Sequence, residues 1–205
     1  MGRKFNIWLF VAVVVVLPLS VYAVVNWYER SVQALPVLIS KTHTIADYRL
    51  VNQLGKESSI KNWEGKIVVA NFFFTHCPYV CPKMTNNLKK VQKANVGDKN
   101  LLFVSFSVDP ERDSSEQLQK FARRFNIDEG NWQLLTGSKK EIYRLARKSF
   151  QVIATDGDGG ENDFIHSDQL VLIDAQKRIR GYYEGTEEKE TDQLIKDIKK
   201  LENEN

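Results

Sequence analysis

An apolar run, residues 67–74, in which Asn71 is the one polar residue, leads directly into a segment that holds the only two cysteines of the chain, Cys77 and Cys81. A run of this length, rich in β-branched and aromatic residues, is typical of a buried strand. Pro78 and Pro82 suit the first turn of a helix, where a missing N–H group costs little. The sequence therefore predicts that both cysteines lie at a strand-to-helix turn, at or near a helix N-terminus.

A position at a helix N-terminus favours ionisation of a cysteine. The free N–H groups and the macrodipole of a helix N-terminus stabilise a thiolate relative to a thiol. A thiolate is a nucleophile and a soft metal ligand. Two ordinary half-buried cysteines would show the same spacing, but paired cysteines at such a turn recur in redox and metal-binding proteins. We therefore expect a redox pair, a metal site or both.

The N-terminal region predicts a membrane anchor. Residues 7–25 carry no charge, and Arg3 and Lys4 precede them. About 20 apolar residues span the hydrocarbon core of a bilayer, and basic residues stay on the cytoplasmic side. We expect residues 1–6 in the cytoplasm, an uncleaved single-pass anchor over 7–25, and the rest on the outer face of a bacterial inner membrane, in the periplasm. A cleaved signal peptide is the alternative, although its apolar region is usually only about 7–15 residues long.

The remaining chain is long enough for one domain with its own core. We expect a linker over residues 26–41 and a single domain over residues 42–205. The net charge of the chain is only +3 and its lysines are spread along the sequence, so nothing indicates nucleic-acid binding. No cysteine follows the apolar run directly, which excludes a lipid-anchored lipoprotein, whereas an exported domain with one cysteine pair can form a disulfide.

The apolar periodicity alternates between strands and helices after residue 48. The expected elements are a hairpin over 48–59, strands over 66–74, 101–108 and 132–135, helices over 83–95, 114–125 and 139–150, a hairpin over 169–174 and 178–184, and a final helix over 187–201. This order predicts an α/β three-layer domain. With paired cysteines after its first core strand, the domain is expected to be thioredoxin-like, with an N-terminal hairpin extension and one transmembrane helix.

A third site residue is expected from the same fold. Thioredoxin-like proteins place a cis-proline before the strand that begins the C-terminal hairpin, but none of the five prolines stands there. The chain has His166 at that place, so on this fold the imidazole would face Cys77 and Cys81. Two thiolates and one imidazole suit copper, as Cu(I) or Cu(II), and zinc would also accept them.

Three motifs together resemble the Sco/SenC family. They are Phe-Thr-His-Cys-Pro-Tyr-Val-Cys-Pro-Lys-Met over 74–84, Ser-Val-Asp-Pro-Glu-Arg-Asp over 107–113, and the histidine before the strand over 169–174. The resemblance covers about residues 45–203 and the anchor. It implies a membrane-tethered, thioredoxin-like copper protein that helps to assemble the copper centre of cytochrome c oxidase subunit II. It also implies that Cys77, Cys81 and His166 are the copper ligands.

The implied partners are subunit II of the oxidase or another terminal-oxidase assembly factor, with an upstream copper chaperone as a further candidate. Two positions depart from the family pattern. Tyr79 and Ile165 stand where many members have an acidic residue. Both departures remove negative charge near the expected metal and leave the three expected ligands unchanged.

Other candidate ligands are weaker. We expect His76 to be structural or to support a ligand, His43 to be solvated in the linker, and Met84 to lie in the core. The acidic segment 156–163 begins like a calcium loop but lacks the glycine at position 6, and Ser167 occupies position 12. A surface loop is the better interpretation of that segment.

Two function classes remain open. A metallochaperone would hold copper on Cys77, Cys81 and His166, and a reversible Cys77–Cys81 disulfide would abolish the site. A thiol–disulfide oxidoreductase would use Cys77 as the attacking thiol and Cys81 as the resolving thiol, and would reduce the cysteines of the oxidase copper site. The spacing of the cysteines and the missing cis-proline weigh against the enzyme. A copper or redox sensor would use the same residues with another partner.

Overall fold

The computed structural model describes residues 12–40, 42–152 and 167–204. The chain divides into two compact units, Met1–Ala34 and Leu35–Asn205. In the first unit, a short π-helix (η1, Ala12–Val16) continues into helix α2 (Leu17–Gln33), whose apolar side chains are largely exposed. Among the helices of the described part, none is both long and apolar enough to cross a membrane. The expected span over 7–25 begins in residues outside that part, so the anchor stays a prediction.

The second unit is built on one seven-stranded sheet. Its strands, in spatial order, are β2 (Glu57–Ser58), β1 (Leu50–Asn52), β5 (Trp132–Thr136), β4 (Leu101–Ser107), β3 (Ile67–Phe73), β6 (Gln169–Ile173) and β7 (Ile179–Glu184). The three central strands β3, β4 and β5 are parallel, and β1, β2, β6 and β7 join them in antiparallel pairs. Because parallel strands end at the same edge, the chain segments after β3 and β4 meet there.

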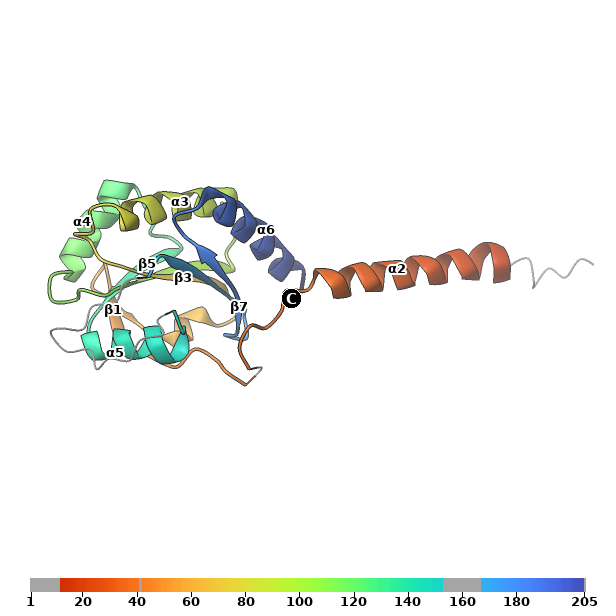
Figure 1. The fold of residues 1–205 in the computed structure, drawn as a ribbon, viewed down its shortest axis with the longest axis horizontal. Coiled ribbons are helices and arrows are strands. Elements are labelled where there is room, and N and C mark those ends of the chain that lie inside the picture. The colour runs from red at the N-terminus through yellow and green to blue at the C-terminus, as the bar shows by residue number, and fades with distance from the viewer. Residues whose placement is uncertain (1–11, 41, 153–166, 205) are drawn as a thin grey trace, which may run out of the picture. The chain divides into compact units, whose positions relative to one another are not determined.

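Helices cover both faces of the sheet, which gives the expected three layers (Figure 1). Helices α3 (Val80–Ala94), α4 (Ser115–Phe125) and α6 (Glu188–Glu204) lie on one face. Helix α5 (Lys139–Arg144), which continues into the π-turn η3 (Leu145–Ser149), covers the other. A short 3-10 helix, η2 (Ile60–Trp63), packs its two buried residues into the core on the α5 side.

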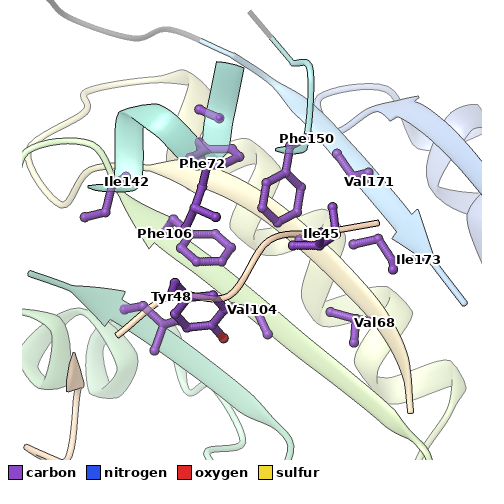
Figure 2. Close-up of a cluster of buried hydrophobic side chains, with 14 of the residues drawn as sticks. Ile45, Tyr48, Val68, Phe72, Val104, Phe106, Ile142, Phe150, Val171 and Ile173 are labelled. Carbon is purple, nitrogen blue, oxygen red and sulfur yellow. The ribbon is translucent and has the colours of Figure 1, made fainter. Parts of the chain in front are cut away.

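Strand β3 separates two hydrophobic cores. Val68, Ala70 and Phe72 point to the α5 side, while Val69 and Phe73 point to the α3 side. Both faces are therefore buried, which explains why the strand is apolar at every position except Asn71. Figure 2 shows the core on the α5 side, where the Phe72 ring stacks on Phe106 at 5.2 Å between centroids and meets Phe150 edge-on at 5.3 Å.

Each predicted strand and helix of the domain is present, with shifted boundaries. Helix α3 begins at Val80 rather than at residue 83, so Cys81 belongs to its first turn. The expected helix over 139–150 is an α-helix that widens into the π-turn η3. Helix α2 runs on to Gln33, through half of the range expected to be a linker.

Candidate metal and redox site

The cysteines lie on the turn between β3 and α3. The Cys77 N–H group donates to the Phe74 carbonyl at 3.3 Å, which bends the chain out of the strand. Cys77 is half-buried and Cys81 is buried, with 4 % of its surface exposed. The Cys81 N–H group donates to Cys77 Sγ at 3.3 Å, and both thiols are free. The structure therefore brings the pair together at the start of the helix, as predicted.

The two thiols have different acidities. Burial opposes ionisation of Cys77, but N–H groups at the start of α3, from Cys81, Tyr79 and Val80, donate to its sulfur and bring its pKa below the usual value. Burial raises the pKa of Cys81 to about 12, and the neighbouring Cys77 and Asp113 act in the same direction. Cys77 is thus the better nucleophile and the more readily ionised ligand.

A hollow of about 370 Å³ opens beside the cysteines. Its walls are mostly apolar and come from the ends of β3 and β4, from the start of α3 and from the residues before β6; they are Phe72, Phe73, Phe74, Cys77, Pro78, Tyr79, Val80, Cys81, Val108, Ser167 and Asp168. Tyr79, at the expected acidic position, is 82 % exposed. A partner's side chain or a ligand can therefore reach Cys77 from solvent.

His166 lies outside the described residues, as do Ile165 and the acidic segment 156–163. The residue that follows His166, Ser167, lines the same hollow as both cysteines. Within the described ranges, no three cysteine, histidine or acidic side chains converge as a metal site. A three-ligand site that includes His166 therefore stays a prediction.

The other histidines and Met84 have partners of their own. His76 is exposed, and its Nδ1 lies 3.1 Å from Thr75 Oγ1. Met84 is fully buried and its sulfur accepts a hydrogen bond from Asn71, so the expectation that it lies in the core is confirmed. The expectation that His43 is solvated was wrong: the side chain is half-buried, and its Nε2 lies 2.8 Å from the Ser149 carbonyl oxygen.

His43 is half-buried because of tertiary contacts made by the segment that carries it. The segment before β1 docks on the edge strand β7 and on the turn before it. Leu38 N–H donates to the Ile179 carbonyl at 3.1 Å, and Ile45 N–H donates to the Lys177 carbonyl at 3.2 Å. The segment before β1 was expected to be a free linker because its partners are distant in the sequence and cannot be identified from it.

Asp113 is a further residue beside the cysteine turn, which was not expected from the sequence. Its carboxylate is fully buried and accepts hydrogen bonds from Thr75 and Ser107. Asp113 closes one of the three sequence motifs, but its pairing with a residue on the cysteine turn crosses 38 positions of sequence. Asp113 lies six positions after the end of β4, so the strand pattern of the sequence did not indicate this role.

Comparison with protein families gives one match over most of the chain. A family model described as SCO1/SenC matches residues 37–203. The SCO1 protein homolog of Bacillus subtilis is 35% identical over 159 residues, which are 77% of this chain and 82% of that protein. The match includes the cysteine turn and all seven strands of the sheet.

Solved structures with the same fold support this match. A SCO1/SenC family lipoprotein from Bacillus anthracis has a TM-score of 0.70 at 35% identity, over 82% of this chain and 99% of that one. BsSco, described as a member of the Sco family of cytochrome c oxidase assembly proteins with a disulfide switch, has a TM-score of 0.70 at 32% identity, over 83% and 98%. ScoI of Bradyrhizobium japonicum with copper bound has a TM-score of 0.63 at 25% identity, over 77% and 99%. The domain thus has the thioredoxin-like α/β fold of Sco proteins, as predicted.

Proposed function

This chain belongs to the SCO1/SenC family, and we propose that it binds copper and delivers it to the copper centre of cytochrome c oxidase subunit II, or helps to mature that centre. The observation that carries the proposal is the pair of free, unequal thiols at the mouth of a hollow that also reaches Ser167. The copper-bound relative ScoI and the oxidase-assembly relative BsSco support it.

The proposed ligands are Cys77, Cys81 and His166. Two thiolates select copper in its reduced state, and an added imidazole lets the site accept the oxidised ion. His166 directly precedes Ser167 in the sequence, and Ser167 lines the hollow beside the cysteines. Copper is the cargo of this site, so the site has to release it as well as hold it.

The unequal cysteines suit transfer by ligand exchange. Cys77 is half-buried at the hollow, with a lowered pKa, so an incoming ligand from a docked partner has access to the metal on this side. Cys81 is buried, so a docked partner would reach Cys77 before Cys81. Oxidation of both thiols to a disulfide removes two ligands at once and couples delivery to redox state.

A copper titration of the reduced full chain tests the proposal. We expect one equivalent to bind and, after oxidation to Cu(II), an intense thiolate-to-copper charge-transfer band. His166→Ala is expected to lose most of the copper affinity while disulfide exchange by the cysteines stays intact. Unchanged copper binding in His166→Ala would refute the three-ligand site, and absence of stoichiometric binding in the wild type would refute the copper function.

One observation favours a second function, thiol–disulfide exchange. An accessible thiol of lowered pKa beside a buried thiol is the arrangement that an attacking and a resolving cysteine require. In this role Cys77 attacks a disulfide of the oxidase copper site, and Cys81 then displaces the reduced partner. Ready exchange with a model disulfide, in a protein that binds no copper, would assign the chain to this class.

We also propose that the chain is held at the membrane by residues 7–25, with the domain on the outer face. Its relative from Bacillus anthracis is a lipoprotein, but the two cysteines of this chain are Cys77 and Cys81, both in the folded domain. A lipid on a cysteine near the anchor is therefore not available to it. We expect the full chain to stay in the membrane pellet after extraction with alkaline carbonate, and release into the supernatant would contradict the anchor.

A further inference from the structure

Asp113 is a carboxylate with no exposed surface, and it lies next to the cysteine turn. Its Oδ2 accepts hydrogen bonds from the Thr75 N–H group at 3.0 Å and from Ser107 Oγ at 2.6 Å, and its Oδ1 accepts from the Thr75 hydroxyl. A buried carboxylate is costly unless such bonds compensate its lost hydration. These three bonds all reach the ends of β3 and β4.

The bonds connect two segments that are separate in the sequence. Thr75 lies two positions after the end of β3 and two before Cys77, and Ser107 is the last residue of β4. The Val108 N–H group adds a bond to the Phe73 carbonyl at 2.8 Å. The turn that carries Cys77 is therefore held at its strand end by β4 and by the loop that follows it.

The other end of the turn is helix α3, which has no side-chain cap at its N-terminus. The N–H groups of this first turn are directed at the Cys77 sulfur instead, with the Cys81 N–H group at 3.3 Å. Their alignment depends on where the turn places Cys77. A residue that fixes Thr75 therefore also fixes the sulfur relative to these donors.

We propose that Asp113 is a positioning residue for the dithiol site, because its buried carboxylate pins Thr75 and thereby holds Cys77 against the first turn of α3. Asp113 itself touches neither sulfur in this role. Its consequence for copper rests on the proposed function, whereas its consequence for the reactivity of Cys77 does not. Oriented supporting residues of this kind typically change metal affinity by about 10- to 100-fold when they are removed.

Two substitutions of Asp113 distinguish the effect of its hydrogen bonds from the effect of its negative charge. In Asp113→Asn, the amide oxygen accepts from the Thr75 N–H group and Ser107, and the NH₂ group donates to Thr75 Oγ1. The Thr75 hydroxyl is then free to donate to His76 Nδ1, which is 3.1 Å away. Asp113→Asn therefore keeps the anchor without the charge, whereas Asp113→Ala removes both. If the negative charge of Asp113 decided the reactivity of Cys77, the Cys77 thiol would ionise more readily in both variants, because a nearby negative charge disfavours a thiolate.

The matched control is Asp174→Ala. Asp174 is 3% exposed and accepts bonds from the backbone of Gln176 and the side chains of Arg178 and Arg180. It follows β6, which runs antiparallel to β3, so it lies at the opposite end of the sheet from the cysteines. We therefore expect Asp174→Ala to destabilise the domain without changing the geometry of the cysteine turn.

The experiment measures the rate at which iodoacetamide alkylates Cys77 in the full reduced chain, together with copper affinity. We expect Asp113→Ala to lower the alkylation rate by about tenfold, through loss of the aligned N–H donors. Its copper affinity should also fall, while Asp113→Asn and Asp174→Ala should stay close to wild type in both measurements. A faster rate in both Asp113 variants, or a folded Asp113→Ala with unchanged rate and affinity, would overturn the proposal.

If Asp113→Ala does not fold, Thr75→Val decides. It removes the hydroxyl bond to the carboxylate, together with the contacts of that hydroxyl to His76 and Gln117, and keeps the backbone N–H bond to Asp113. A smaller loss of rate supports the proposal and an unchanged rate overturns it. If the wild type binds no copper, the copper function fails on its own account, and the alkylation rates still decide the role of Asp113.

Discussion

The two cysteines show how different surroundings give identical side chains different pKa values. Cys77 and Cys81 are four positions apart, yet the first turn of α3 donates N–H groups to one sulfur while the core surrounds the other. The pKa of Cys77 is lowered by those hydrogen bonds, against the effect of its partial burial, and burial raises that of Cys81 to about 12. Near neutral pH the pair is therefore one reactive sulfur and one protonated thiol.

This difference predicts selective alkylation. We expect iodoacetamide to modify Cys77 and to spare Cys81 near neutral pH. An acid of lowered pKa ionises at lower pH, so the rate should rise with pH with a midpoint lower than that of an ordinary thiol. Mass spectrometry of the digested chain measures the two sites, and Cys77→Ser should remove the fast phase. Equal modification of both cysteines would contradict the assignment.

At the scale of elements, the site depends on where strand ends meet helix starts. Helix α3 accommodates Pro82 in its first turn, where the backbone nitrogen needs no intrahelical partner. Gly185, which follows β7, packs against the same helix: its N–H group donates to the Asp168 carbonyl, and its own carbonyl accepts from Asn87. These contacts set the separation between the end of the sheet and α3.

Gly185→Ala should therefore be destabilising. A Cβ atom there would lie 2.7 Å from the Asp168 carbonyl oxygen and 2.8 Å from Met84 Cγ, and both belong to packed structure. We expect the free energy of unfolding to fall by about 1–3 kcal/mol, as for other overpacked sites. Urea denaturation measures it. Gly130→Ala is the control, because its added Cβ meets only the exposed Asp128 side chain, and equal effects of the two changes would refute the packing argument.

At the scale of the whole domain, Arg180 joins the two ends of the unit Leu35–Asn205. Its guanidinium, 5% exposed, pairs with Asp174 at 3.0 Å and with Glu204 at 2.6 Å, and it also donates to the Leu35 carbonyl. Leu35 begins this unit and Glu204 ends its last helix. One buried cation on β7 thus holds the start of this unit and the end of its last helix to the sheet.

Removing this cation should cost more than removing a surface charge. Arg180→Ala leaves the buried Asp174 carboxylate with one fewer cation, and breaking a buried pair typically costs about 3–5 kcal/mol. Lys90→Ala removes an exposed pair with Glu188 and should cost less than about 1 kcal/mol. Urea denaturation of both variants tests the difference. Similar small losses would show that Arg180 does not secure the termini.

Much of this architecture could be predicted from the sequence because it depends on neighbours along the chain. The run over 67–74 identified β3, since a strand buried on both faces has apolar residues at nearly every position, here at all but Asn71. The alternation of strands and helices predicted the three layers. The prolines beside the cysteines placed the pair at a helix start, although α3 begins a few residues earlier than its periodicity indicated.

The pairing of distant residues required the tertiary structure. The bond between Asp113 and Thr75, the bond between His43 and Ser149, and the unequal burial of the two thiols all depend on which segments the sheet brings together. The sequence by itself determined the order of the elements and the position of the cysteine pair. Only the tertiary structure decided their chemical environment, because burial and hydrogen bonding depend on distances in space and periodicity reports only distances along the chain.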